Sequence, residues 1–283
     1  FLIIGAKKAA TTSLHNYLKQ HPDIFMSKLK EARYFAFDEN DIEHRRKVPK
    51  SFPITTLEEY KKLFEGVTNE TVIGESSPNY LASPVAPLKI KNLIPHSKLI
   101  VCLRNPVDRA YSNYVMNTRQ GSESRSVYNA LRKDSSFVKS GLYFNDVKRY
   151  IDLFGREQFK IILYDEFEKD PLMVVQDIFS FLEVDSHFVP DMSIRYNQGG
   201  FQTNRVLNFI FQTYDRNKRL KIKLRKVLSP QLRNQWVRLK LRHQIAPPPL
   251  PNDLRIDMQS FFRADVEMLA SLIDTKLDHW LKM

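Results

Sequence analysis

The sequence predicts an α/β protein with a central parallel sheet and helices on both of its faces. Short apolar runs alternate along the chain with segments of helical periodicity, which is the pattern of βαβ crossovers. Hydrophobic residues make up 42% of the 283 residues, so the chain can bury a core of this kind. The length suits one large α/β unit, and we therefore expect residues 1–283 to form a single domain.

Each predicted element follows from a local pattern. Four apolar runs are the candidate strands, at residues 1–4, 72–74, 98–103 and 159–164. The third run, KLIVCL, is apolar enough for a parallel strand that is buried on both faces. Helical periodicity is found at residues 11–20, 57–64, 87–93, 107–118, 144–154, 171–182 and 254–273. Residues 203–251 are expected to be largely helical and to end in a stiff connector formed by Pro247, Pro248 and Pro249.

The charge of the chain favours anionic partners. Lys and Arg outnumber Asp and Glu by 44 to 32, which gives a formal net charge of +12. Such a field attracts nucleotides, polyanionic glycans or acidic membrane surfaces. The excess is concentrated at residues 216–242, which is either a solvated helical face or a patch that binds a polyanion or a membrane.

Cysteine content and apolar segments bear on the compartment. Cys102 is the only cysteine, so no disulfide can form within the chain and a reducing compartment is favoured. We find no run of about 18 apolar residues, and the apolar start is too short for a signal peptide. The expected location is the cytoplasm. Because the chain begins without Met, we also expect that it is a domain of a longer polypeptide.

The loop after the first predicted strand has the composition of a phosphate-binding loop. Residues 5–13 read GAKKAATTS and link a buried strand to the start of a helix, where amide groups and the helix dipole favour an anion. Lys8 adds a formal charge that can reach a transferred group. The loop is not a Walker A motif, because Ala10 precedes Thr11 where that motif has Lys.

The loop after the third predicted strand has a second anion-binding signature. Asn105, Pro106 and Asp108 together specify the start of a helix. Arg104 therefore lies at the carboxyl end of a strand, where open α/β sheets bind their ligands. Ser112 lies two turns into the helix, and a guanidinium with a hydroxyl can hold a phosphate.

These two loops resemble those of the sulfotransferases that use 3′-phosphoadenosine 5′-phosphosulfate (PAPS), and in particular the branch of heparan sulfate sulfotransferases and their bacterial relatives. The first family pattern, roughly G-x-x-K-x-G-T-T-x-L, is matched by Gly5, Lys8, Thr11, Thr12 and Leu14. The second, roughly R-x-P-x-x-R-x-x-S, is matched by Arg104, Pro106, Arg109 and Ser112. Weaker similarity extends over nearly the whole chain. The resemblance implies a P-loop-like sulfotransferase fold with a helical C-terminal part.

The resemblance also implies residue roles. Lys8 would contact the phosphosulfate bridge, and Glu31 falls on the position of the catalytic base. Arg104 and Ser112 would hold the 3′-phosphate of PAPS. Thr11, Thr12 and Ser13 with their backbone amides would hold the 5′-phosphate, and Lys8, Ala9 and Ala10 of the same loop are also expected to bind the donor. Expected on the acceptor side are Lys30, Arg33, Ser76 and Tyr80, together with the basic segment of residues 203–251.

Two departures from the family pattern lead to further expectations. Ala9 and Ala10 replace glycines of the first loop, so we expect that loop to use ordinary backbone angles. Ser76 stands where heparan sulfate members often carry a Lys, which argues against a heparan-type acceptor.

The implied reaction is an in-line sulfuryl transfer from PAPS to an acceptor hydroxyl or amine, with a carbohydrate as the expected acceptor. We predict no metal requirement, because a sulfuryl group carries less charge than a phosphoryl group, and no nucleic-acid partner. Two alternatives stay open from the residues alone: a kinase-like P-loop enzyme that acts on nucleotides or nucleosides, and a non-catalytic protein that binds polyanions or membranes.

Overall fold

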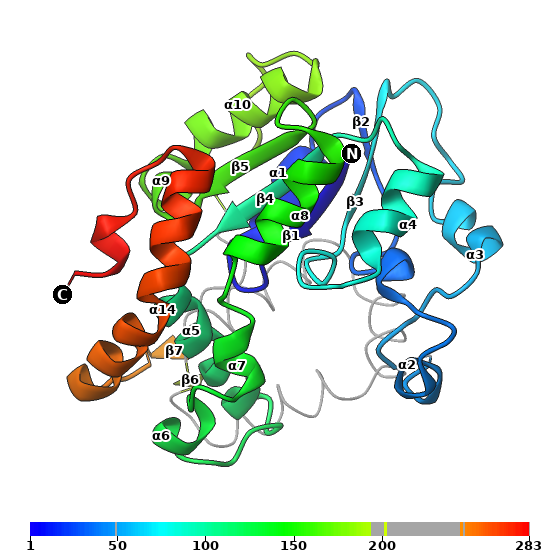
Figure 1. Ribbon diagram of the computed structural model, residues 1–283. Coiled ribbons are helices and arrows are strands. Elements are labelled where there is room, and N and C mark those ends of the chain that lie inside the picture. Colours follow the sequence, from blue (N-terminus) through cyan, green and yellow to red (C-terminus); the bar gives the residue numbers. More distant parts are fainter. Residues whose placement is uncertain (49, 194–200, 203–243, 246, 283) are drawn as a thin grey trace.

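A computed structural model describes residues 1–48, 50–193, 201–202, 244–245 and 247–282. Its centre is a five-stranded sheet with the strand order β2-β3-β1-β4-β5, in which every neighbouring pair is parallel (Figure 1). The strands are β1 (Leu2–Gly5), β2 (Ile24–Met26), β3 (Val72–Ser76), β4 (Leu99–Leu103) and β5 (Phe159–Leu163). The predicted parallel sheet is thus confirmed.

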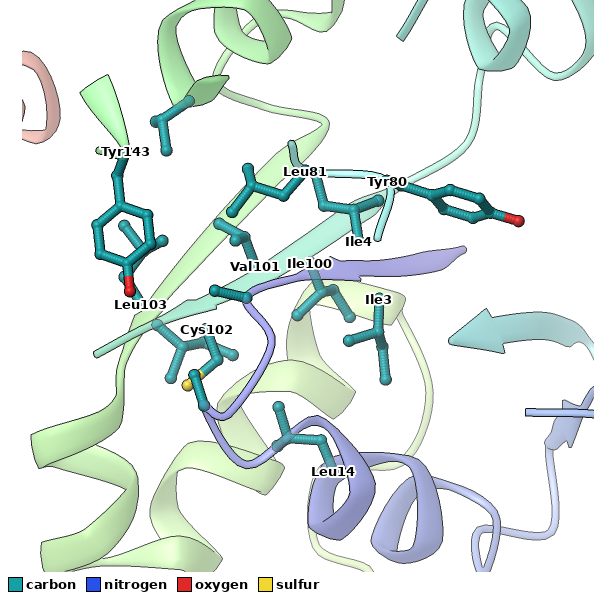
Figure 2. Close-up of a cluster of buried hydrophobic side chains, with 14 of the residues drawn as sticks. Ile3, Ile4, Leu14, Tyr80, Leu81, Ile100, Val101, Cys102, Leu103 and Tyr143 are labelled. Carbon is teal, nitrogen blue, oxygen red and sulfur yellow. The ribbon is translucent and has the colours of Figure 1, made fainter. Parts of the chain in front are cut away.

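The middle of the sheet is buried on both faces. Side chains alternate between the two faces of a strand, and Figure 2 shows Ile3 on the side where Leu14 lies and Ile4 on the side where Leu81 lies. All four side chains are buried to 3% exposure or less. Cys102 of β4 is fully buried in the same layer. These apolar runs read as continuous rather than alternating because both faces are covered.

Helices cover both faces of the sheet, as expected. On one face, α8 (Phe144–Phe154) packs against α4 (Ala86–Leu93) and α14 (Asn252–Ile273), and Figure 1 shows α8 in front of the strands. On the other face, α1 (Thr11–Leu18) packs against α10 (Pro171–Leu182). The helix α5 (Pro106–Arg119) follows β4 and contacts α14 and the short helix α7 (Ser136–Lys139).

The remaining elements are short. They are η1 (Tyr34–Ala36), α2 (Ile42–Arg46), α3 (Leu57–Lys62), α6 (Val127–Ala130), α9 (Tyr164–Lys169) and η2 (Asp278–Trp280). None of the helices in the described residues is long and apolar enough to cross a membrane.

Two sequence expectations differ from the structure. The strand β2 was not predicted, because it has only three residues and gains its hydrogen bonds from β3. In the segment 203–251, residues 203–243, which include the whole basic patch at 216–242, lie outside the described residues. At its edges the chain forms a short antiparallel pair, β6 (Phe201–Gln202) with β7 (Gln244–Ile245), and not helix.

Candidate active site

The strand order opens a crevice between β1 and β4. The chain leaves β1 toward β2 and β3 on one side of the sheet, whereas it leaves β4 toward β5 on the other side. Loops that part in opposite directions leave space at the carboxyl ends of the two strands, and ligands of open α/β sheets bind at such switch points. A cavity of about 880 Å³ lies there, lined by residues of both predicted anion-binding loops.

The first loop reaches this cavity through two residues in the left-handed conformation. Lys8 has a φ of 71° and Ala10 a φ of 52°, so the expectation of ordinary backbone angles was wrong. The turn is held by its neighbours: the Ala6 amide donates to the Cys102 carbonyl at 2.8 Å, and Ala9 is completely buried. A left-handed alanine costs about 1 kcal/mol, which packing of this kind can offset.

This loop aims the start of α1 at the cavity. Ala10 precedes the helix and no side chain caps its N-terminus. Thr11, Thr12 and Ser13 of the first turn line the cavity. Because the N-terminal end of a helix carries a partial positive charge, this arrangement favours a bound anion.

Lys8 lies in the same cavity among other cations. Its Nζ donates to the Met116 Sδ of α5 at 3.4 Å. Burial, together with the positive charges of Arg119 and Arg104, lowers the pKa of Lys8 to about 8. A lysine with a pKa this low lacks enough nearby negative charge, and a bound anion would supply it.

The second loop has the predicted structure. Asn105 caps α5 by accepting a hydrogen bond from the Val107 amide at 3.0 Å, and Pro106 is the first helical residue. Arg104 donates from Nη1 to the Lys8 carbonyl at 3.2 Å, which links the two loops directly. Its guanidinium lies 4.3 Å from the ring centre of Tyr164. The structure therefore brings both loops into one site.

Glu31 also lines this cavity, and its charge is paired. It accepts hydrogen bonds from Arg33 Nη2 at 2.5 Å and from Lys30 Nζ at 3.2 Å. Burial raises the pKa of Glu31, but the positive charges and hydrogen bonds of Lys30 and Arg33 outweigh it and lower this pKa overall. Glu31 is therefore ionised at neutral pH and can accept a proton.

Most of the predicted site residues line the cavity, but two of them do not. Lys8, Ala9, Ala10, Thr11, Thr12, Ser13, Glu31, Arg33, Arg104 and Ser112 line the cavity. Lys30 reaches it through its ion pair with Glu31. Ser76, the last residue of the inner strand β3, and Tyr80, which follows that strand, have 0% exposure and are not among the cavity-lining residues. The predicted acceptor contacts of these two residues are thus not supported by their positions.

Several cavity residues were missed by the sequence analysis. Tyr164 directly follows β5, and Phe167 lies one turn further on in α9. Tyr17 of α1 stacks on Phe167 with ring centres 6.4 Å apart. The position of Tyr164 at the end of a predicted strand was the signal that could have identified it. Among the described residues, no three His, Cys, Asp or Glu side chains form a group suited to a metal ion.

Known proteins are similar to this chain in sequence and in fold. A family model described as a sulfotransferase domain matches residues 1–242. The chain is 27% identical over 282 residues to the mouse bifunctional heparan sulfate N-deacetylase/N-sulfotransferase 4, which covers 92% of this chain and 31% of that protein. It is 26% identical over 199 residues to the mouse heparan sulfate glucosamine 3-O-sulfotransferase 5, which covers 65% of this chain and 53% of that protein.

The chain spans about a third to a half of the length of these two relatives. Among solved structures, a sulfotransferase from Alicyclobacillus acidocaldarius matches with a TM-score of 0.73 and 32% sequence identity. That match covers 100% of this chain and 98% of the other. On the evidence of its site, its sheet and these matches, the chain belongs to the sulfotransferase family.

Proposed function

We propose that the chain transfers the sulfuryl group of PAPS to a hydroxyl or amine of a glycan. The observation that carries this proposal is the meeting of Lys8 and Arg104 in one cavity, although they follow different strands. Two cations at a switch point provide sites for two anionic groups of one nucleotide, and PAPS differs from ATP in having a 3′-phosphate. Membership of the sulfotransferase family favours this donor over the kinase-like alternative.

The residues at the cavity fit such a donor. The low pKa of Lys8 indicates positive charge that the protein itself does not neutralise. Arg104 and Ser112 would hold the 3′-phosphate, whereas the first turn of α1 would hold the 5′-phosphate. The donor supplies a sulfuryl group on a phosphate, which is a good leaving group.

Glu31 and Lys8 would act on opposite sides of the transferred group. Glu31 takes the proton of the acceptor as the acceptor oxygen or nitrogen bonds to sulfur, a role that contributes ~10²–10⁴-fold for a well-placed base. Lys8 in its charged form meets the negative charge that develops on the oxygen leaving sulfur. The products are the sulfated acceptor and 3′-phosphoadenosine 5′-phosphate (PAP).

Two observations support a glycan as the acceptor. The relatives named above are heparan sulfate N- and 3-O-sulfotransferases, so both amines and hydroxyls of one glycan class are candidates. Ser76, from which the sequence argued against a heparan-type acceptor, is buried and does not line the cavity, so we do not count it against this class. In the structure, Lys30 and Arg33 flank Glu31, where they could contact an acidic sugar. A panel of N-desulfated and N-acetylated heparan sulfate with radiolabelled PAPS distinguishes the amine from the hydroxyl.

Calorimetric binding of PAP tests the donor site, with 5′-AMP as the ligand that lacks the 3′-phosphate. Charged hydrogen bonds contribute about 1.5–3 kcal/mol, so we expect PAP to bind roughly 10- to 100-fold more tightly than 5′-AMP. Arg104→Ala should remove most of this difference. Arg263→Ala is the matched control, because Arg263 is exposed on α14 and pairs with Glu267 at 3.7 Å. Equal binding of the two nucleotides to the unaltered protein would refute the proposed donor.

A further inference from the structure

A buried carboxyl group lies behind the acceptor side of the active site. Glu75, in β3, has 0% exposure, and its Oε1 accepts a hydrogen bond from the Ser77 hydroxyl at 2.5 Å. Its other oxygen has no hydrogen-bond partner among the described residues. Burying a carboxyl group that is only partly hydrogen-bonded is costly, so its presence in a sheet interior needs an explanation.

Ser77 connects this carboxyl group to the segment that carries Glu31. The Ser77 hydroxyl accepts a hydrogen bond from the Arg33 amide at 2.9 Å, and the Ser76 carbonyl accepts one from the Glu31 amide at 2.8 Å. The end of β3 therefore fixes the turn at Glu31 and at Arg33, two residues apart. Both residues have left-handed backbones, with φ values of 62° and 59°.

These backbone angles need support from outside the turn. A residue other than glycine in the left-handed region costs of order 1–3 kcal/mol and persists only where its surroundings enforce it. The hydrogen bonds from the Glu31 and Arg33 amides to the end of β3 hold these two residues in the left-handed conformation. Without the Ser77 contact, Arg33 could relax, and its ion pair with Glu31 would move with it.

The Ser77 hydroxyl depends in turn on Glu75. A serine hydroxyl has one proton to donate. Because its oxygen receives the Arg33 amide, its proton points to Glu75, and the carboxyl oxygen fixes the rotamer that the Arg33 contact requires. The hydrogen bonds run in one direction, from the Arg33 amide through the hydroxyl to the carboxyl group.

We propose that Glu75 is a positioning residue of the active site, which acts through the Ser77 hydroxyl to hold the Glu31–Arg33 turn so that Glu31 stays at the cavity. This inference rests on the role proposed above for Glu31. Burial raises the pKa of Glu75 to about 7, while the hydrogen bond from Ser77, the nearby Tyr80 hydroxyl and the charges of Lys30 and the Phe1 amino group lower it. The positioning role needs only an acceptor oxygen, which the neutral and the ionised carboxyl group both provide.

Four variants test this relay, by which we mean the hydrogen bonds from the Arg33 amide to the Ser77 hydroxyl and from that hydroxyl to Glu75. Ser77→Ala and Glu75→Leu each interrupt it, whereas Glu75→Gln keeps an acceptor oxygen for the hydroxyl. Ser83→Ala is the matched control: Ser83 is also buried and accepts a backbone amide, that of Ala86 at 3.2 Å, but it lies in the loop before α4. For each variant we would measure hydrogen exchange of peptides covering residues 30–36, the Kd of PAP, and kcat and KM with PAPS and N-desulfated heparan sulfate.

Ser77→Ala and Glu75→Leu should lower kcat about 10- to 100-fold, because a displacement near 1 Å can cost that much. The Kd of PAP should stay within about twofold, since the donor-binding loops follow β1 and β4, and exchange protection of residues 30–36 should fall. Glu75→Gln should recover most of both losses. The proposal is overturned if the relay variants lose no more than Ser83→Ala, or if Glu75→Gln is as impaired as Glu75→Leu.

Failure of the proposed function gives a different result. If the unaltered protein neither binds PAP nor transfers sulfate to the glycan, the reaction assigned to the site is wrong. The exchange measurement does not need either ligand. Loss of protection at residues 30–36 in Ser77→Ala, with recovery in Glu75→Gln, would still support the relay, and unchanged protection would still overturn it.

Discussion

Raising the pH above 8 should weaken nucleotide binding through the loss of one proton from Lys8. Burial and the neighbouring Arg119 and Arg104 lower the pKa of Lys8 to about 8 in the ligand-free protein. A bound phosphate favours the charged ammonium and raises this pKa again. The nucleotide therefore binds to the form of the protein in which Lys8 is protonated. The contribution of Lys8 to nucleotide affinity is nearly complete at pH 7 and is lost as the pH rises through 8.

The size of the effect follows from this pKa. At pH 7 about one-tenth of Lys8 is neutral and at pH 9 about nine-tenths, so the affinity for PAP should fall about tenfold between them, or about 1.4 kcal/mol. At pH 8 binding should take up about half a proton per nucleotide. The phosphates of the ligand contribute little here, because their second ionisation lies near pH 6 and is about complete.

Calorimetry at pH 8 in two buffers of different ionisation enthalpy measures this proton uptake directly. Lys8→Arg should abolish it, because a guanidinium stays charged throughout this range. Lys7→Arg is the matched control, since Lys7 is the adjacent lysine, also lines the cavity, and has a pKa that burial lowers too; if this variant keeps the uptake, the proton belongs to Lys8. The reasoning is refuted if the unaltered protein takes up no proton at pH 8, or if Lys8→Arg takes up as much.

Three further predictions concern stability, measured by chemical unfolding. Ala10→Gly should change the free energy of unfolding by less than about 1 kcal/mol, because Ala10 has a left-handed backbone, which glycine adopts without strain. Ala9→Gly should lower the free energy of unfolding by about 1 kcal/mol or more. Equal losses in the two variants would contradict this reasoning. Asp265→Ala should cost roughly 1–3 kcal/mol, since its carboxylate accepts the Tyr143 amide at 2.7 Å, and a loss below 0.5 kcal/mol would count against it. The pKa of Glu75 rises from 4.5 in the unfolded chain to about 7, so this residue costs stability as the pH rises between these values. Glu75→Gln lacks this titration. The free energy of unfolding of Glu75→Gln minus that of the unaltered protein should therefore increase by roughly 1–3 kcal/mol from pH 5 to pH 8. If this difference does not change with pH, the carboxyl group does not titrate as described.

The meeting of the two anion-binding loops could be predicted because it depends on strong local patterns. The runs that became β1 and β4 are continuously apolar, and each ends at a basic loop. Carboxyl ends of neighbouring parallel strands lie at one edge of a sheet, so Lys8 and Arg104 could be expected near each other. The three residues of β2 carry no such pattern, and only their pairing with β3 makes them a strand.

The acceptor side was harder to predict because its geometry depends on tertiary packing. The sequence Glu75-Ser76-Ser77 is polar and gives no sign of burial, yet all three residues are completely buried. Their burial follows from the inner position of β3 between β2 and β1, which local periodicity does not show. In the same way, the left-handed backbone of Ala10 is set by packing around the loop and is contrary to the preference of alanine.

The burial of Cys102 gives the chain a built-in reporter of its own internal motion. This single thiol lies in β4, beside the central strand β1 and next to the first loop, and a reagent in solution can modify it only when β4 opens. The rate of labelling therefore measures how often the centre of the sheet opens in the unmodified protein, without an engineered probe. Repeating the measurement with PAP would show whether occupation of the cavity slows that opening and by how much, which links ligand affinity to the local stability of the strand beneath it.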